Sequence, residues 1–373
     1  MPARTTDVTR RLACAAALAL VAGCMSGPDY VKPAVEAPAT FQYLPADAVD
    51  AAGSAWWKAF GDPVLDALVD EALANNRNIA IATANVEQAA ALFTQARSTL
   101  FPQLGYGAGA GRERTSESGV RPEVAALVHN PTSAYQAALQ ASWELDLWGR
   151  VRRQSEAARA NVLATVEARR GVVLSLVASV VSGYLQLRAL DAQLEVSRKT
   201  LAAYDESVKL FELQFKYGQV SKMNVVQAQS QYETAAAQIP ATETQIAQAQ
   251  DALSILVGRN PGPIARGKSI DQLVAPPVPA GLPSSLLERR PDLAQAEQQL
   301  VAANAQIGAA KALYFPRITL TGALGFASGD LSDLFKGPAR IWSYAGQVAG
   351  PIFTFGAVSG QVAQAEAAQR AAL

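Results

Sequence analysis

The spacing of hydrophobic residues changes several times along the chain, and its longest regular stretch predicts a helical hairpin. From Arg150 to about Tyr217 the apolar residues recur in steps of three and four, which predicts one long helix that supercoils against a neighbour. A returning helix over residues 222–257 keeps two strictly seven-spaced seams. The first seam is Val225, Tyr232, Ile239, Ile246 and Leu253, and the second is Ala228, Ala235, Thr242, Ala249 and Leu256. The small residues of the second seam favour a broad layer of helices, with a plain two-stranded coiled coil as the alternative.

Two residues modify this predicted hairpin. Ser221 follows the break at Gly218 and is expected to cap the returning helix. Pro240 lies inside that helix, where it removes a backbone hydrogen bond and is expected to kink or strain it.

Four other segments alternate with a period of two. The clearest is 135–147, where Tyr, Ala, Leu and Trp side chains point one way and Gln, Ser, Glu and Asp side chains point the other. Segments starting at Leu104, Ile318 and Trp342 repeat this alternation. Apolar-out, polar-in strands with aromatic residues near their ends are typical of transmembrane β-strands, although a soluble hairpin with one buried face is an alternative. No stretch beyond the N-terminus has 18 uninterrupted apolar residues, so a membrane crossing would use closed β-strands.

Shorter helices precede these strands. Asp62-Pro63 has the composition of a helix start, with aspartate as the cap and proline in the first turn. A second helix is expected from about Asn78 to Leu100, ended by Pro102.

The chain repeats itself at an offset of 214 residues. Phe101-Pro102-Gln103-Leu104 corresponds to Phe315-Pro316-Arg317-Ile318, and the preceding helical residues correspond without a gap. A later correspondence, at an offset of 207, places Gly149 opposite Gly356. Such a repeat predicts one supersecondary unit used twice. By the second offset another long helix begins near Ala357, and the chain is expected to be C-terminally truncated at Leu373.

The N-terminus has the pattern of a lipoprotein signal. Arginines precede the short apolar segment 12–21, and Val21-Ala22-Gly23-Cys24 resembles a lipoprotein box, so residues 1–23 are predicted to be removed. Cys24 is the predicted lipidation site, carrying palmitate, and Met25 after it gives no inner-membrane retention signal. The Pro- and Ala-rich stretch that follows predicts an anchored N-terminal linker over 24–61.

Charge and motif content argue against enzymatic and nucleic-acid functions. Basic and acidic residues number 32 each, so the net charge is zero and no nucleic-acid partner is implied. Gly262–Ser269 matches the phosphate-binding pattern G-x-x-x-x-G-K-S, but a heptad helix precedes it and prolines stiffen it. His129, the only histidine, lies in a polar loop, and no metal cluster, cofactor site or nucleophile with its base is found. The sequence therefore predicts no catalytic residue, and a nucleotide-driven enzyme is retained only as an alternative.

Several segments together resemble a known family. They are Cys24 with Gly27-Pro28-Asp29-Tyr30, then 56–65, 141–149, Tyr217-Gly218-Gln219-Val220-Ser221, and 282–293. On these residues the chain is similar to the TolC-like outer membrane factors, in the NodT-type lipoprotein branch, over essentially all of residues 20–373.

The resemblance implies a mixed α and β fold with internal duplication. Long antiparallel coiled-coil helices would form a periplasmic α-barrel, and four transmembrane β-strands per chain would enter a trimeric 12-stranded β-barrel. The expected first repeat is 62–257, with a β-hairpin over 103–147 and a helical hairpin over 150–257. An equatorial linker over 258–284 and an incomplete second repeat over 285–373, with a β-hairpin over 317–355, complete the expected organisation.

The resemblance also implies the function. The chain would be the exit duct of a tripartite efflux system in the outer membrane, a homotrimer working with a periplasmic adaptor and an inner-membrane transporter of the resistance–nodulation–division type. The tip residues Tyr217, Gly218, Gln219, Val220 and Ser221 would contact the adaptor, although Met223-Asn224 replaces the family's usual Leu-Asp. The alternative is a periplasmic coiled-coil adaptor or structural lipoprotein without a pore.

Overall fold

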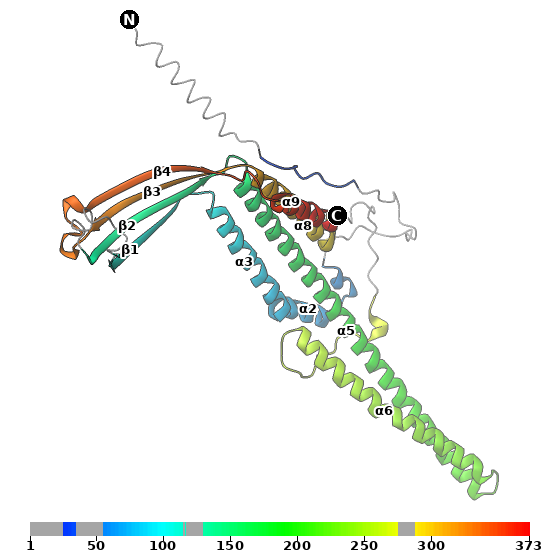
Figure 1. Ribbon diagram of the computed structural model, residues 1–373. Coiled ribbons are helices and arrows are strands. Elements are labelled where there is room, and N and C mark those ends of the chain that lie inside the picture. Colours follow the sequence, from blue (N-terminus) through cyan, green and yellow to red (C-terminus); the bar gives the residue numbers. More distant parts are fainter. Residues whose placement is uncertain (1–24, 35–54, 115, 117–129, 275–287) are drawn as a thin grey trace. The chain divides into compact units, whose positions relative to one another are not determined.

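The computed structural model describes residues 25–34, 55–114, 116, 130–274 and 288–373 (Figure 1). Predictions for the signal segment 1–23, for Cys24 and for His129 lie outside the described residues. The chain forms two compact units. The first unit contains 1–33, 87–164 and 296–373, and the second contains 34–86 and 165–295.

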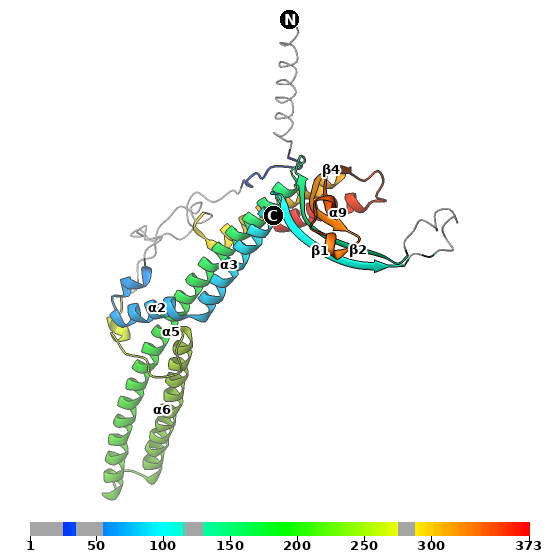
Figure 2. The same cartoon turned by 90° about the vertical axis from the view of Figure 1, so that its left-hand side faces the viewer.

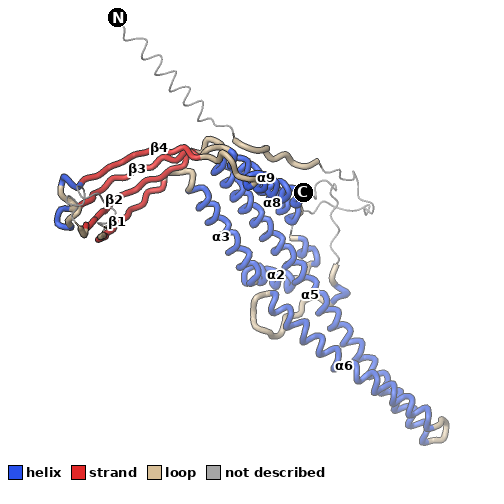
Figure 3. The backbone as a smooth tube through the Cα atoms, viewed as in Figure 1, coloured by secondary structure: helices blue, strands red, loops and turns tan. Residues whose placement is uncertain are grey.

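The described residues form long helices and four strands (Figure 3). The α-helices are α2 (Pro63–Asn75), α3 (Arg77–Ser98), α5 (Arg150–Lys216), α6 (Lys222–Leu256), α8 (Pro291–Lys311) and α9 (Ala357–Ala372). The strands are β1 (Gln103–Glu113), β2 (Thr132–Leu145), β3 (Arg317–Ser328) and β4 (Arg340–Ala349). Short 3-10 turns are η1 (Trp56–Phe60), η3 (Ile270–Gln272), η4 (Ala312–Tyr314), η5 (Leu331–Asp333) and η6 (Gly337–Ala339). The fold is the mixed α and β architecture that the sequence predicts.

In the second unit, α2 begins where the sequence predicts. Pro63 is the first helical residue, and the carboxylate of Asp62 accepts the backbone N–H of Val64 at 2.9 Å. The apolar face of α2 packs into a core that also contains Tyr184 and Leu187 of α5 and Leu253 of α6. The prediction of a helix opening at Asp62 is confirmed.

α5 and α6 run antiparallel over the second unit as a hairpin (Figures 1 and 2). Every residue of the two predicted seams of α6 is buried or half-buried, from Val225 near the tip to Leu256 at the other end. The seven-residue spacing therefore identified the packed face correctly. α6 continues through Pro240 as one helix, so the predicted disturbance does not interrupt it. Pro240 is exposed, and water can satisfy the carbonyl that lost its donor.

α5 is also the one described helix with enough apolar length to cross a membrane. An 18-residue window has a mean hydropathy of 1.5, and a third of that window is buried within the chain. Leu176, Val177 and Val180 belong to the second unit's core, so the hydropathy of this stretch has a packing role in the fold.

In the first unit, the four strands form one antiparallel sheet in the order β1-β2-β3-β4. The β1–β2 and β3–β4 hairpins are local, but β2 and β3 pair across the whole helical hairpin: Leu145 is opposite Ile318. β1 and β4 are the open edges of the sheet. The sheet is strongly curved, as Figure 2 shows.

The elements repeat where the sequence does. α3 and α8 each start 26 residues before their strands β1 and β3, which begin at Gln103 and Arg317, and the two strand starts are 214 residues apart, as the first offset requires. The glycines that precede α5 and α9 are both left-handed, with φ of 78° at Gly149 and 90° at Gly356. α9 begins at Ala357, the predicted residue.

Several boundaries differ from the prediction. β2 ends at Leu145 and β4 at Ala349, so Leu147 and Ile352 lie outside the strands. β2 ends at Leu145 because the next residue already belongs to the start of α5. The Asp146 carboxylate accepts the N–H groups of Val151 and Arg152 in the first turn of that helix. α3 ends at Ser98 because Thr99 and Leu100 form a turn ahead of Phe101-Pro102.

Candidate functional site

One face of the sheet is an uncovered apolar surface. The register aligns Tyr106, Leu139, Leu324 and Trp342 in one row across all four strands. Their exposed fractions are 89%, 50%, 49% and 68%, although residues of this kind are usually buried. Trp342 stacks on Tyr344 of the same face, with ring centroids 5.7 Å apart. A surface this apolar needs an apolar environment.

The opposite face of the sheet carries small and polar side chains. Gln140, Ser142, Thr321 and Ser343 lie around one shallow hollow of about 400 Å³. Adjacent residues on a strand point to opposite faces, so every apolar position in the row above has a polar or small neighbour on this side. The sheet thus separates an apolar surface from a polar one, as the period of two predicts.

Aromatic side chains fasten the sheet where it meets the helices of the first unit. Trp148 stacks on Phe315 with centroids 4.6 Å apart, and its indole N–H donates to the Pro316 carbonyl at 2.8 Å. The Trp143 indole N–H donates to the Leu100 carbonyl at 3.0 Å. A tryptophan with one apolar side and one satisfied N–H suits the boundary between a membrane and water. We call this end of the sheet its base.

A second feature of the first unit is the strap, residues 25–33, which lies against α5 and α8. The guanidinium of Arg153 is 2% exposed and donates to the Ser26 carbonyl at 3.2 Å and to the Asp29 carboxylate at 2.6 Å. The Ser26 N–H donates to the Trp148 carbonyl at 3.0 Å. A Cβ on Gly27 would overlap the backbone of Gly308, so the contact needs both glycines.

The strap continues along α8. Asn304 donates to the Pro28 carbonyl at 3.0 Å, Tyr30 donates to Glu297 at 3.3 Å, and Lys32 forms an ion pair with Glu297 at 3.2 Å. From its composition, this segment was predicted to be only a linker. In the structure, the strap is extended but bound to α5 and α8 by several hydrogen bonds and an ion pair. Arg153 was missed because nothing in the sequence around it distinguishes this buried arginine from the half-buried Arg150 and Arg152.

The helical tip in the second unit is built as a C-terminal helix cap followed by a new helix. Gly218 has φ of 72°, its N–H donates to the Phe215 carbonyl, and the Gln219 N–H donates to the Gln214 carbonyl. These two bonds are those of a Schellman motif, which favours glycine at this position. The predicted contact residues Tyr217, Gly218, Gln219 and Ser221 are exposed and Val220 is half-buried, so the tip presents an open surface.

Ser221 does not cap α6 with its side chain. Its hydroxyl donates to the Asn224 side-chain oxygen at 2.6 Å instead. The prediction that the Ser221 side chain caps α6 is therefore wrong, because its hydroxyl binds the Asn224 side chain and not a backbone N–H group of the helix. Met223 beside it is 77% exposed, which adds an apolar group to the tip.

The segment Gly262–Ser269 surrounds a carboxylate of the chain itself. The Lys268 N–H donates to Asp62 at 3.0 Å, the Gly267 N–H donates to the Tyr184 hydroxyl at 3.0 Å, and that hydroxyl donates to Asp62 at 2.7 Å. Asp62 and Tyr184 have no exposed surface, and a Cβ on Gly267 would overlap the Asp62 carboxylate. The Gly267 and Lys268 amide groups, which would bind a phosphate in such a motif, are occupied, and the helix α6 precedes the segment. The nucleotide-site alternative is therefore rejected.

Burial, and then the hydrogen bond to Asp62, raise the pKa of Tyr184 to about 12. In the unfolded chain that pKa is about 10. The stability that neutral Tyr184 contributes is therefore complete below pH 10 and is lost as the pH rises from 10 towards 12. The natural protein should have a higher free energy of unfolding than Tyr184→Phe. We expect this difference to decrease by about 1 kcal/mol between pH 9 and pH 11. Denaturant titrations followed by helical circular dichroism measure it, and a difference that stays constant over this range would contradict the assignment.

No group of three or more His, Cys, Asp or Glu side chains that could hold a metal ion occurs in the part of the chain that the structure describes.

Comparison with known proteins identifies relatives of this arrangement. The family model described as "Outer membrane efflux protein" matches residues 68–259 and 282–373. The toluene efflux pump outer membrane protein TtgF of Pseudomonas putida is 37% identical over 95% of this chain and 75% of its own length. The cation efflux system protein CusC of Escherichia coli K12 is 37% identical over 91% of this chain and 73% of its own length.

Solved structures share the fold. The outer-membrane channel OprN superposes with a TM-score of 0.86 at 31% identity, covering 94% of this chain and 78% of that one. The open state of the MtrE outer membrane channel of Neisseria gonorrhoeae superposes with a TM-score of 0.83 at 33% identity, covering 94% of this chain and 77% of that one.

Proposed function

This chain belongs to the outer membrane efflux protein family, and we propose that it is the outer-membrane channel of a tripartite efflux pump, passively conducting small molecules. The two-faced sheet carries this proposal: one face suits lipid and the other suits water, as in transmembrane β-barrels. The protein has no catalytic role. The alternative of a periplasmic coiled-coil adaptor without a pore leaves the apolar face and both open strand edges without a function.

The open edges support a trimer. Within a bilayer the unpaired backbone groups of β1 and β4 have no water to bind, so each edge needs a partner strand. Pairing β4 of one copy with β1 of the next closes twelve strands from three copies, and the curvature of the sheet suits closure (Figure 2). Purified protein in planar lipid bilayers should give stable conductance steps and migrate as a heat-sensitive trimer. A monomer that stays soluble without detergent and never conducts would overturn the proposal.

Cys24 is the proposed lipidation site, with the acyl chains in the outer membrane. The strap supports this assignment because it begins at the residue directly after Cys24 and fastens Ser26 to Trp148 at the base of the sheet. The lipid would then enter the bilayer beside the barrel. Mass spectrometry of the mature N-terminus tests the modification, and an unmodified cysteine would exclude it.

The helical tip is the proposed contact for the periplasmic adaptor, and the adaptor in turn would connect it to an inner-membrane transporter of the resistance–nodulation–division type. Tyr217 and Met223 are 71% and 77% exposed, and an aromatic and a flexible apolar side chain are typical of binding hot spots.

We expect Tyr217→Ala and Met223→Ala each to weaken adaptor binding by about fivefold or more, without affecting assembly of the channel. Surface plasmon resonance with the immobilised trimer measures this. Val196→Ala is the matched control, because Val196 is 62% exposed on α5 but distant from the tip in sequence. An equal loss in the control, or no loss in the tip variants, would contradict the assignment.

A further inference from the structure

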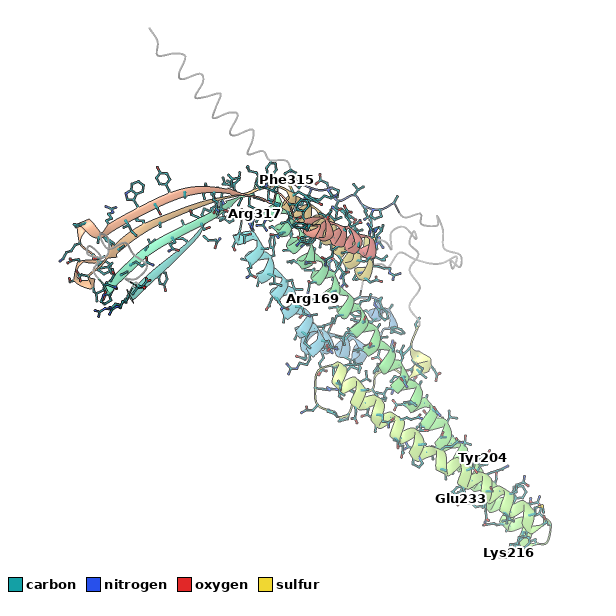
Figure 4. All side chains as sticks on the ribbon, viewed as in Figure 1. Arg169, Tyr204, Lys216, Glu233, Phe315 and Arg317 are labelled. Atoms are coloured by element: carbon teal, nitrogen blue, oxygen red, sulfur yellow. The ribbon has the colours of Figure 1, made fainter. Side chains whose placement is uncertain are left out.

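Arg317 places a positive charge at the base of the polar face of the sheet. It is the first residue of β3, is opposite Ala349 of β4, and is exposed. Because Ile318 belongs to the apolar face, Arg317 belongs to the polar one. Figure 4 labels it at the start of β3, close to Phe315 of the aromatic stack.

The acidic groups at the base are already neutralised by other residues. Glu144 forms a two-pronged ion pair with Arg150, at 2.7 Å and 2.9 Å. Asp146 accepts two backbone N–H groups and pairs with Arg152 at 3.3 Å. The guanidinium of Arg317 has no hydrogen bond or ion pair with any described residue, so it is the surplus charge at this level of the sheet.

The rest of the polar face contributes no competing charge. Between Glu144 at the base and Glu113 at the far end of β1, the strand residues on this face are glutamine, serine, threonine, alanine, glycine and one isoleucine. A solute moving along this face therefore meets Arg317 against a neutral background.

The internal repeat supplies a natural comparison. Gln103 occupies the corresponding position in β1, and its side chain turns back to donate to the carbonyls of Ser98 at 2.8 Å and Phe101 at 3.1 Å. The two copies of the unit thus differ here by one unit of charge. In a closed barrel of three chains, three arginines would alternate with three glutamines around the base.

We infer that Arg317 is a specificity-determining residue that makes the base of the barrel favour anionic solutes. The inference rests on the proposed trimeric channel with its polar face inward. Rings of arginine or lysine select anions in other pores, and a narrow low-dielectric passage concentrates their field. The field reaches about 10 Å at 0.1 M salt and about 3 Å at 1 M salt, so the preference should fade as salt is added.

The test measures the reversal potential across planar bilayers under a KCl gradient. At about 0.1 M salt we expect Arg317→Gln to lower the ratio of chloride to potassium permeability by about twofold or more. We expect Gln103→Arg, which copies the second repeat into the first, to raise that ratio. Both changes should diminish at about 1 M salt.

Arg340→Gln is the matched control, because Arg340 is opposite Phe326 and so belongs to the apolar face at the far end of the sheet. It should leave the ratio unchanged. Channels that conduct normally but keep the same ratio after both Arg317→Gln and Gln103→Arg would overturn the inference. Absence of conductance in the natural protein would instead count against the proposed function itself.

Discussion

Replacing Leu324 by arginine is expected to stop the chain from assembling in the outer membrane. Leu324 lies in the middle of the apolar row, between Leu139 on β2 and Trp342 on β4. An arginine on the lipid face near the bilayer midplane costs about 2–4 kcal/mol, and a trimer would carry three of them. The total is comparable to the whole folding free energy of many domains.

Membrane fractionation and the heat-sensitive gel shift measure this effect. We expect the Leu324→Arg trimer band to fall to a small fraction of the natural level. Thr321→Arg is the matched control, because Thr321 is on the same strand but on the polar face. It should assemble normally, and equal damage from both variants would mean that the two faces have been assigned wrongly.

Removing the Asp62 carboxylate is expected to give the second large effect. Asp62→Ala eliminates the cap of α2 and leaves the Tyr184 hydroxyl and the Lys268 N–H without an acceptor in a buried place. Losing a helix cap costs about 1 kcal/mol. Leaving two buried donors without their charged acceptor costs more. We expect the second unit to lose about 3–5 kcal/mol of unfolding free energy.

Denaturant titration of the helical signal tests this expectation. Asp70→Ala is the matched control, because Asp70 is exposed on the same helix and should change stability by no more than about 0.5 kcal/mol. Asp62→Ala and Tyr184→Phe should also be strongly non-additive, because the two side chains share one hydrogen bond. Additive effects, or equal loss in the control, would contradict the role given to this carboxylate.

The sequence predicted those elements whose pattern is local. The period of two placed the four strands, seven-residue spacing identified the packed face of α6, and the repeat located the start of α9 at Ala357. The strands and the packed face of α6 were predictable because neighbouring residues along the chain determine which side of a strand or helix is buried. The start of α9 was predictable because it repeats the start of α5.

What the sequence could not supply is the partnership between distant residues. Asp62 was identified as a cap, but its other donors, Tyr184 and Lys268, are 122 and 206 residues away. The strap was expected to be a simple linker, since proline and alanine content says nothing about a buried arginine such as Arg153, 124 residues beyond Asp29. At the tip, Ser221 is in the right position to cap α6, but its hydroxyl donates to the Asn224 side chain instead.

The pairing of β2 with β3 determines when this sheet can be completed. Leu145 and Ile318 are separated by the entire helical hairpin, so a chain emerging from the membrane translocation machinery holds only one hairpin of the sheet for most of its synthesis. Contacts of such long sequence separation form slowly, and exposed strand edges invite aggregation while they wait. The helical part, whose contacts are more local, can fold first. The order of folding is therefore built into this topology: the first strand pair has to persist with an open edge until the second pair has been made.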